Sequence, residues 1–265
     1  EINSNTMAQK TKKKTGEKTP ADSGFVIELE FGGPLSLLVS EDRRVWHIRG
    51  VVEDLRAGNT VPYLIHYILE MRRLQHGQVT LHGAGVAKDG NAILILGKQG
   101  SGKTSLCLEL CRKYGYSLVG NDLVLFGVEG SQGYLYGGTK VFRLRRASIA
   151  RYNTDLRWAF ATTQPDRDDW TATTVIKPED IGVAVITQPV AVDRIVYVHL
   201  LNDSAQPLHV APVERVFSRL FLYEEMSRYI RGVCFPMFSR ATLEYSAYLP
   251  SLDSPFLYEQ RKRLL

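Results

Sequence analysis

The sequence predicts an α/β fold, and three neighbouring patterns predict it. Ala92–Leu96 is an uninterrupted apolar run, which is typical of a strand buried on both faces. A glycine-rich stretch follows, and apolar residues then recur at helical spacing up to Gly115, where a helix would end. A second strand-like run, Tyr116–Val119, comes next. This order of strand, loop, helix and strand indicates a sheet covered by helices.

The glycine-rich stretch matches the pattern G-x-x-x-x-G-K-[ST] of a phosphate-binding P-loop. Backbone N–H groups of such a loop surround a polyphosphate, while its lysine contacts the outer phosphates and its hydroxyl residue binds the accompanying magnesium. The following helix directs its positive N-terminal end at the same phosphates. A Gly/Ser connector is the alternative, which the strand-to-helix setting disfavours. We expect nucleotide binding by Gly97, Lys98, Gln99, Gly100, Ser101, Gly102, Lys103, Thr104 and Ser105.

Length and composition narrow the class of protein. The 265 residues, 44% hydrophobic and 23% charged, fit a globular protein with one large domain, or with a core domain and a smaller attachment. No apolar run reaches the length of a membrane span, and no signal-peptide pattern is present. The three cysteines show neither zinc spacing nor a disulfide framework. We therefore expect a cytoplasmic protein in which Cys107 and Cys111 face the core.

The net charge of +5 comes largely from two stretches. Residues 1–23 are rich in lysine and lack hydrophobic periodicity, so we expect a flexible basic tail, part of it processed or introduced because the chain opens on Glu1. The stretch Lys140–Arg151, which includes Arg143, contains no acidic residue. It is either a solvated basic face or a surface for an anion near the nucleotide. No recognised nucleic-acid motif accompanies this charge.

Two folded segments are expected after the tail. Residues 24–77 combine a strand at Phe25–Phe31, a hairpin and a helix from Pro62 to near Gly77, and should form a small N-terminal α/β subdomain. Residues 78–265 should form the nucleotide-binding core with C-terminal helices.

Within that core, the sequence predicts a strand at Val79–Val86, a tight hairpin turn at Asp89-Gly90 and a buried strand at Arg194–Leu201. The polar composition of Asp155–Pro178 predicts a loop-dominated insert. Val213–Arg231 has the pattern of an amphipathic helix. Its expected inward residues are Val216, Phe217, Leu220 and Phe221.

Phosphoryl transfer needs a carboxylate for magnesium, a group that orients the acceptor, and cations that offset charge. Asp122 is expected at the end of the strand that begins at Tyr116, in the crevice that parallel strands share with a P-loop, and Leu123–Phe126 should continue after a kink. Thr104 and Asp122 are then the expected metal ligands. A turn-forming Asn121-Asp122 pair is the alternative. His82, flanked by small residues, is by itself more typical of a structural hydrogen-bond partner.

Three segments in order, Leu81–Val86, Gly97–Ser105 and Leu118–Asp122, resemble the catalytic core of HPr kinase/phosphorylase, which is itself similar to phosphoenolpyruvate carboxykinase. The short chain is most similar to a reduced form of that core, as in serine kinases of lasso-peptide precursors. The resemblance implies a P-loop core of this type, ATP or GTP with Mg²⁺, and oligomers. It also implies catalytic roles for Lys103 and Asp122, with His82 beside the transferred phosphate.

One position departs from the family's pattern. The family carries an acidic pair after this strand, and its first acid is assigned as the base for the acceptor serine. Asn121 stands at that position here, and an amide cannot accept a proton at neutral pH. The base is then Asp122 or another carboxylate. Arg228 and Arg231, which share a face of the predicted helix, are candidate substrate contacts together with Arg143; the alternative is an exposed polar edge.

We therefore expect an ATP- and Mg²⁺-dependent kinase that transfers the γ-phosphoryl group to a Ser or Thr hydroxyl of a peptide or protein, such as a peptide natural-product precursor. Its expected partners are a nucleotide and this substrate, without membrane or nucleic acid. Three alternatives remain open. One is a kinase of a small molecule such as free serine, and another is a nucleotide-binding module without transfer, which Asn121 favours. The third is carboxykinase chemistry, which the short chain disfavours.

Overall fold

The computed structural model describes residues 25–30, 36–40, 45–49, 60–160, 169, 171–200, 209–230 and 253–265. The chain divides into two compact units. The first comprises Glu1–Thr60 and Phe238–Tyr248, and the second comprises Val61–Met237 and Leu249–Leu265. The expected tail, residues 1–23, lies outside the described residues.

The described part of the first unit is a three-stranded antiparallel sheet in the order β1-β2-β3. Its strands are β1 (Phe25–Glu30), β2 (Ser36–Ser40) and β3 (Trp46–Arg49). Leu38 is opposite His47 in the β2–β3 hairpin, and the Val45 backbone N–H donates to Ser40 Oγ at 2.9 Å. The predicted strand and hairpin are therefore confirmed.

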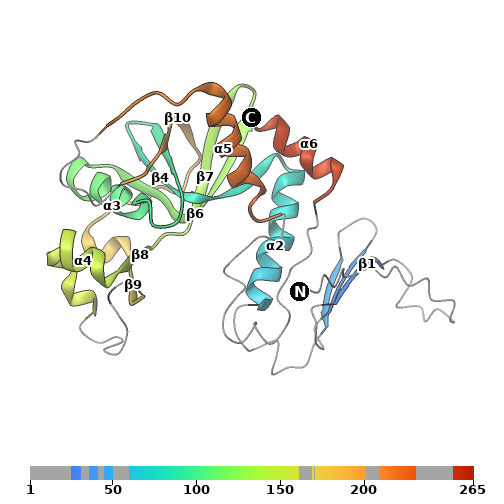
Figure 1. Cartoon of the computed structure of the whole chain (residues 1–265), viewed down its shortest axis with the longest axis horizontal. Helices are drawn as coiled ribbons and strands as arrows, with labels where there is room; N and C mark the ends of the chain where they lie inside the picture. Colours follow the sequence, from blue (N-terminus) through green and yellow to red (C-terminus); the bar gives the residue numbers. More distant parts are fainter. Residues whose placement is uncertain are drawn as a thin grey trace, which may run out of the picture. The chain divides into compact units, whose positions relative to one another are not determined.

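In the second unit, five strands close into a barrel in the order β10-β5-β4-β6-β7 (Figure 1). Strand β10 runs parallel to β5 and pairs with β7, whereas the other pairs are antiparallel. The fold is thus mixed α/β, with the predicted antiparallel hairpin β4–β5 and one parallel pair, β10–β5, in the central sheet. The strands are β4 (Gln78–Lys88), β5 (Asn91–Leu96), β6 (Ser117–Glu129), β7 (Gln132–Gly138) and β10 (Val190–Tyr197).

The local predictions around the P-loop are confirmed. The β4–β5 turn places Asp89 and Gly90 at φ 51° and 79°, as a tight hairpin turn requires. Helix α3 (Lys103–Tyr114) ends at Gly115, whose φ of 71° is left-handed. Strand β10 was predicted as a buried strand at Arg194–Leu201, but it runs from Val190 to Tyr197 and only Val190 is buried in it.

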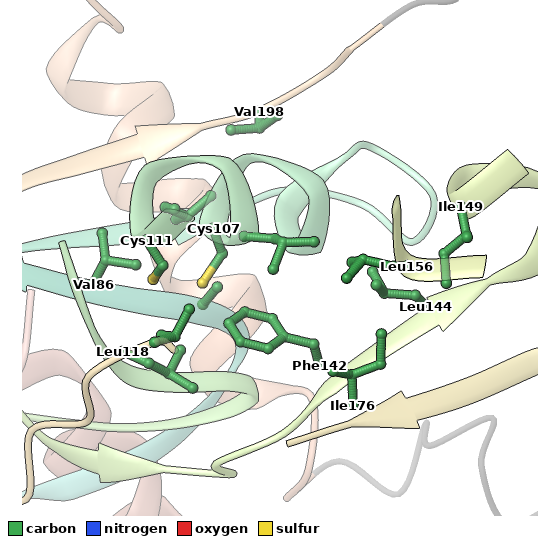
Figure 2. Close-up of a cluster of buried hydrophobic side chains, with 14 residues drawn as sticks. Val86, Cys107, Cys111, Leu118, Phe142, Leu144, Ile149, Leu156, Ile176 and Val198 are labelled. Atoms are coloured by element: carbon green, nitrogen blue, oxygen red, sulfur yellow. The ribbon is translucent and has the colours of Figure 1, made fainter. Parts of the chain in front are cut away.

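A hydrophobic core lies between α3, the barrel and a two-stranded sheet of β8 (Phe142–Arg145) and β9 (Thr173–Ile176), as Figure 2 shows. Phe142 and Leu108 are fully buried in it. Cys107 and Cys111 belong to the same cluster as free thiols, as predicted. This core anchors the helix whose first turn follows the glycine-rich loop.

Helix α2 (Thr60–Gln75) lies in the second unit from Val61 onward, whereas the sequence grouped it with the strands of residues 24–77. Met71 and Leu74 are buried, and Glu70 accepts a hydrogen bond of 2.8 Å from the Thr80 backbone N–H on β4. These contacts attach the helix to the barrel. Of the predicted α/β subdomain, the first unit retains the strands.

The segment Asp155–Pro178 contains more regular structure than the predicted loop. It holds the 3₁₀ helix η1 (Thr154–Phe160) and strand β9, and Leu156 and Ile176 are buried in the core. The prediction of a loop followed the polar residues in the middle of this segment, and it missed the two apolar residues near its ends that are buried.

Helix α5 (Arg215–Ser227) buries a different face from the one predicted. Leu222 and Met226 are buried, and α5 packs against β4. The sequence carries two apolar stripes on this helix, and periodicity does not determine which of them meets the barrel. The stripe predicted to face inward is exposed, by 74% at Val216, 50% at Phe217, 50% at Leu220 and 44% at Phe221.

The remaining helices lie at the periphery of the second unit (Figure 1). Helix α4 (Arg146–Tyr152) follows β8, and the 3₁₀ helix η2 (Pro178–Ile181) follows β9. Ser254 precedes helix α6 (Pro255–Arg263) and caps its N-terminus, because Ser254 Oγ accepts a hydrogen bond from the Leu257 backbone N–H at 3.3 Å.

Candidate functional site

The glycine-rich loop connects the end of β5 to the start of α3. Gly97 and Gly102 have φ values of 146° and 97°, which side chains rarely permit. A Cβ atom at Gly97 would lie 2.4 Å from the Val198 carbonyl oxygen, and one at Gly102 would lie 2.7 Å from the Leu200 side chain. The loop therefore needs glycine at both positions, because the chain after β10 packs directly against it.

The N-terminus of α3 is open to an anion. Gly102 is its N-cap, and no side chain of the described residues caps it. The first-turn N–H groups therefore lack side-chain acceptors, and they carry the positive end of the helix dipole. Ser101 Oγ is buried and has no hydrogen-bond partner among the described residues. Thr104 is the second residue of the helix and is half-buried.

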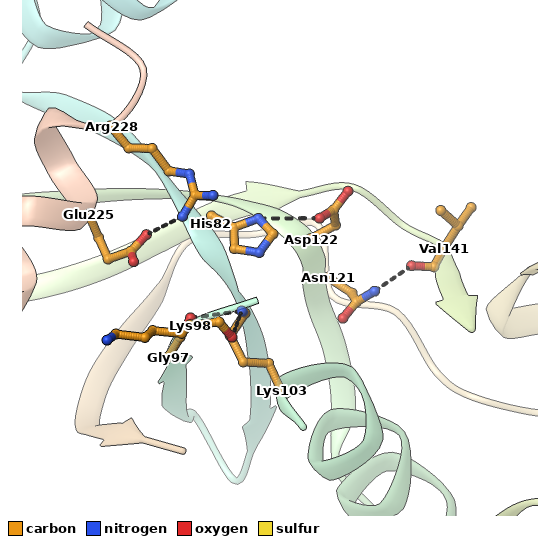
Figure 3. Close-up of polar contacts among 9 residues, drawn as sticks. All are labelled: His82, Gly97, Lys98, Lys103, Asn121, Asp122, Val141, Glu225 and Arg228. Atoms are coloured by element: carbon orange, nitrogen blue, oxygen red, sulfur yellow. Dashed lines mark hydrogen bonds and ion pairs between the residues drawn. The ribbon is translucent and has the colours of Figure 1, made fainter. Parts of the chain in front are cut away.

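Lys103 is 7% exposed, and its amine lies against its own loop. Nζ donates to the carbonyl oxygens of Gly97 at 2.8 Å and Lys98 at 3.1 Å (Figure 3). Burial lowers the pKa of Lys103, Arg228 lowers it further, and the negative charges of Glu225 and Asp122 oppose that shift. The lysine, two carboxylates and an arginine thus lie within electrostatic reach of one another.

Asp122 does not end a strand, contrary to the prediction. Strand β6 continues through it to Glu129, and the backbone has a left-handed φ of 75° at Asp122. The continuous pairing of β6 with β4 carries the strand onward, so the carboxylate extends from a kink within it. Its side chain is 46% exposed, and Oδ1 lies 3.4 Å from His82 Nδ1. The predicted carboxylate therefore faces the predicted histidine across two paired strands.

His82 lies on β4, and its side chain is 19% exposed. Burial, followed by the positive charges of Lys103 and Arg228, lowers the pKa of His82 to about 3. The imidazole is therefore neutral at neutral pH, and it can donate from one nitrogen and accept at the other.

Asn121 points away from this group of side chains (Figure 3). It is 1% exposed, and Nδ2 donates to the Val141 carbonyl oxygen at 3.0 Å. Asn121 thus holds β6 to the segment before β8. The left-handed backbone at Asp122 interrupts the regular alternation of side chains along β6. The Asp122 carboxylate lies beside His82, whereas the Asn121 amide is bonded to Val141.

Helix α5 supplies two charged side chains that complete the group. Arg228, the predicted substrate contact, follows the last turn of α5 and lies near His82 and Lys103. Glu225, which sequence reasoning missed, lies 3.7 Å from Arg228 through Oε2 and the arginine NH1. Burial raises the pKa of Glu225, while Arg228 and Lys103 oppose that rise. Its only sequence signal is its position three residues before Arg228 on a predicted helix.

The other predicted residues are distributed differently. Lys98, Gln99 and Gly100 are exposed on the loop, and Ser105 is half-buried on α3. Arg143 is exposed on β8, and no hydrogen bond or ion pair between described residues joins it to the P-loop. Arg231 lies outside the described residues.

Lys140 is bonded within the protein, whereas the stretch Lys140–Arg151 was expected to be a solvated basic face or a surface for an anion. Its Nζ donates to the carbonyl oxygens of Val119 and Ile186, the latter at 2.8 Å. Arg146 of the same stretch is paired with Asp169 at 3.6 Å. At least these two cations are therefore engaged within the protein.

Magnesium fits the oxygen donors beside the loop. Mg²⁺ takes one or two protein oxygens and completes its shell with phosphate and water oxygens. The exposed carboxylate of Asp122 and the hydroxyl of Thr104 suit this requirement. In the described part of the chain, no group of three or more His, Cys, Asp and Glu side chains could hold a metal ion by itself.

Comparisons with known proteins add little to what the residues of the site indicate. No family model matches the chain, and no curated protein sequence matches it. A solved structure, the HPr(Ser) kinase/phosphatase from Coxiella burnetii, is similar over 49% of this chain and 68% of that one, with 22% identity and a TM-score of 0.27. A TM-score this low supports no conclusion on function, which has to come from the residues of the site. None of the described helices has the length and apolar character needed to cross a membrane.

Proposed function

We propose that the protein is an ATP- and Mg²⁺-dependent kinase that transfers a γ-phosphoryl group to a Ser or Thr hydroxyl of a peptide or protein. The observation that carries this proposal is the grouping of Lys103, Asp122, His82 and Arg228 beside a P-loop. These side chains come from four elements, and a loop that only connected a strand to a helix would not require their convergence.

The cations account for charge stabilisation. Lys103 now donates to two neutral carbonyl oxygens, and phosphate oxygens are stronger acceptors because they are charged. The amine is held close to the loop and would turn from these carbonyls to the outer phosphates. Arg228 adds a second cation to the same space. Two preorganised cations in a poorly hydrated site stabilise the charge on a transferred phosphoryl group.

The remaining groups have distinct roles in this proposal. Thr104 and Asp122 would hold Mg²⁺, which neutralises the β- and γ-phosphate oxygens when it is bound. Neutral His82 would donate a hydrogen bond to the transferred group without adding charge. Asp122 is 46% exposed, so this side of the site is open to a hydroxyl on a large substrate. A peptide acceptor is proposed because the sequence resembles serine kinases of lasso-peptide precursors.

Transfer of label from [γ-³²P]ATP tests the proposal. The acceptors are a degenerate Ser/Thr peptide library and, separately, free serine. Lys103→Ala should lower transfer by about 10³-fold, as loss of a transition-state cation does. Lys113→Ala is the matched control, because Lys113 is exposed on the same helix and pairs with Glu109. Full transfer by Lys103→Ala contradicts the mechanism. ATP binding by the wild type without ADP formation with any acceptor contradicts transferase activity.

A further inference from the structure

Glu225 is a buried carboxylate that the proposed roles leave without a function. Its side chain is 18% exposed, and Oε2 has no hydrogen-bond partner among the described residues. The contact of this oxygen with Arg228 is 3.7 Å, beyond hydrogen-bond distance. A buried carboxylate oxygen without a hydrogen bond costs free energy that a 3.7 Å ion pair offsets only in part, so its retention calls for an explanation.

The charges around Glu225 keep it usable as a base. Burial favours the protonated form and raises its pKa, while Arg228 and Lys103 favour the carboxylate. A base works best when its pKa approaches the working pH while it stays ionised. The raised pKa makes Glu225 a stronger base than a fully solvated glutamate, and Arg228 and Lys103 favour its ionised form.

The other two candidates for this role are placed less well. Asn121 has no basic oxygen and is bonded to the Val141 carbonyl group on the far side of β6. Asp122 is half-exposed beside His82, which suits a magnesium ligand. A carboxylate that binds a metal ion is a weaker base. Glu225 also acts electrostatically on Lys103, and apart from its ion pair with Arg228 the proposed function gives it no role.

On the basis of the proposed kinase activity, we propose that Glu225 is the general base that takes the proton of the acceptor hydroxyl. The hydroxyl O–H bond breaks, and its proton moves to the Glu225 carboxylate. The acceptor oxygen forms a bond to the γ-phosphorus. The bond from that phosphorus to the β–γ bridging oxygen breaks, and ADP leaves with the electron pair. Glu225 then releases the proton to solvent, while Arg228 positions its carboxylate.

The test compares Glu225→Gln with Glu224→Gln, an exposed neighbour on the same helix. Transfer from [γ-³²P]ATP to the most active library peptide is measured from pH 5 to 9, and ATP affinity is measured by calorimetry. We expect Glu225→Gln to lower kcat by 10²- to 10⁴-fold and to keep ATP affinity within about threefold. The wild-type rate should fall as pH falls through the raised pKa of Glu225. Glu225→Gln should lack that acidic limb. Glu224→Gln should keep the wild-type kcat and the limb, displaced slightly to lower pH because the charge of Glu224 raises the pKa of Glu225.

The outcomes separate this inference from the proposed function. A wild type that transfers no label overturns the kinase activity and the inference together. An active wild type with an equally active Glu225→Gln overturns the role of Glu225 alone. A loss of ATP affinity equal to the loss of kcat also overturns it, because that result indicates a structural role. Glu225→Asp keeps the carboxylate, so it should retain the acidic limb at a reduced rate, and loss of the limb would contradict a base at this position.

Discussion

Replacing Asp122 by glycine should separate stability from activity at this site. Asp122 is a non-glycine residue with left-handed backbone, at φ 75°, within strand β6. Such conformations cost free energy, and they occur mostly at functional sites, where the function of the side chain explains why the strained residue is retained. Glycine adopts the same backbone without the Cβ clash. The substitution therefore removes the carboxylate without disturbing the geometry of the strand.

Three terms set the expected change in the free energy of unfolding. Relief of the left-handed conformation stabilises the folded state by about 1 kcal/mol, and by less for Asp than for most residues. The greater freedom of glycine in the unfolded chain costs about 0.5–1 kcal/mol. The contact of the half-exposed carboxylate with neutral His82, at 3.4 Å, contributes little. These terms nearly cancel, so the net change should stay within about 1 kcal/mol of zero.

Asp89 provides a matched control for the backbone effect. It is an exposed aspartate with φ 51° in the β4–β5 turn, so Asp89→Gly makes the same chemical change away from the P-loop. Urea denaturation followed by circular dichroism gives the free energy of unfolding of both variants. Label transfer from [γ-³²P]ATP should fall by at least about 10²-fold in Asp122→Gly and stay unchanged in Asp89→Gly.

Two results would refute this reasoning. Destabilisation of Asp122→Gly by more than about 2 kcal/mol would identify Asp122 as a structural residue, because the three terms do not reach that size. Unchanged transfer by a folded Asp122→Gly would show that the site needs no carboxylate at this position.

Two further predictions concern the barrel and its core. Burial raises the pKa of Glu70 from 4.5 to about 7, so its contribution to stability is present below pH 4.5 and is lost as pH rises through 7. The free energy of unfolding of the wild type should fall by about 3 kcal/mol between pH 4.5 and 8 because of this group. Glu70→Gln should lack that fall when both proteins are unfolded in urea at the two pH values. Equal pH dependence in both proteins would contradict a raised pKa at Glu70. Phe142 is fully buried, so Phe142→Ala should destabilise by about 3–5 kcal/mol, whereas the exposed Tyr114→Ala should change stability by under about 0.5 kcal/mol. Thermal or urea unfolding checks this pair, and a mild effect at Phe142 would place it outside the main core.

Sequence reasoning was most successful where structure is local. The apolar run of β5, the Asp89-Gly90 turn and the Gly115 end of α3 each follow from the backbone preferences of a few adjacent residues. The P-loop pattern also specified which glycines are needed, since Gly97 has no room for a Cβ atom beside Val198. At these places the residue types themselves restrict the backbone to one conformation.

Sequence reasoning failed where the result depends on which surfaces meet. Val216 and Leu222 both lie on apolar stripes of α5, and contact with the barrel selected the stripe of Leu222. At Asp122 the sequence predicted a strand end followed by a kink, but the pairing of β6 with β4 carries one continuous strand past the left-handed residue.

The sequence by itself determined a glycine-rich loop between a strand and a helix, and it singled out Lys103, Thr104, His82 and Asp122 as candidate site residues. Only the tertiary structure decided that Glu225 pairs with Arg228 within electrostatic reach of Lys103. The physical reason is that backbone preferences act over a few residues, whereas this juxtaposition depends on the packing of α5 against β4, two elements far apart in the chain.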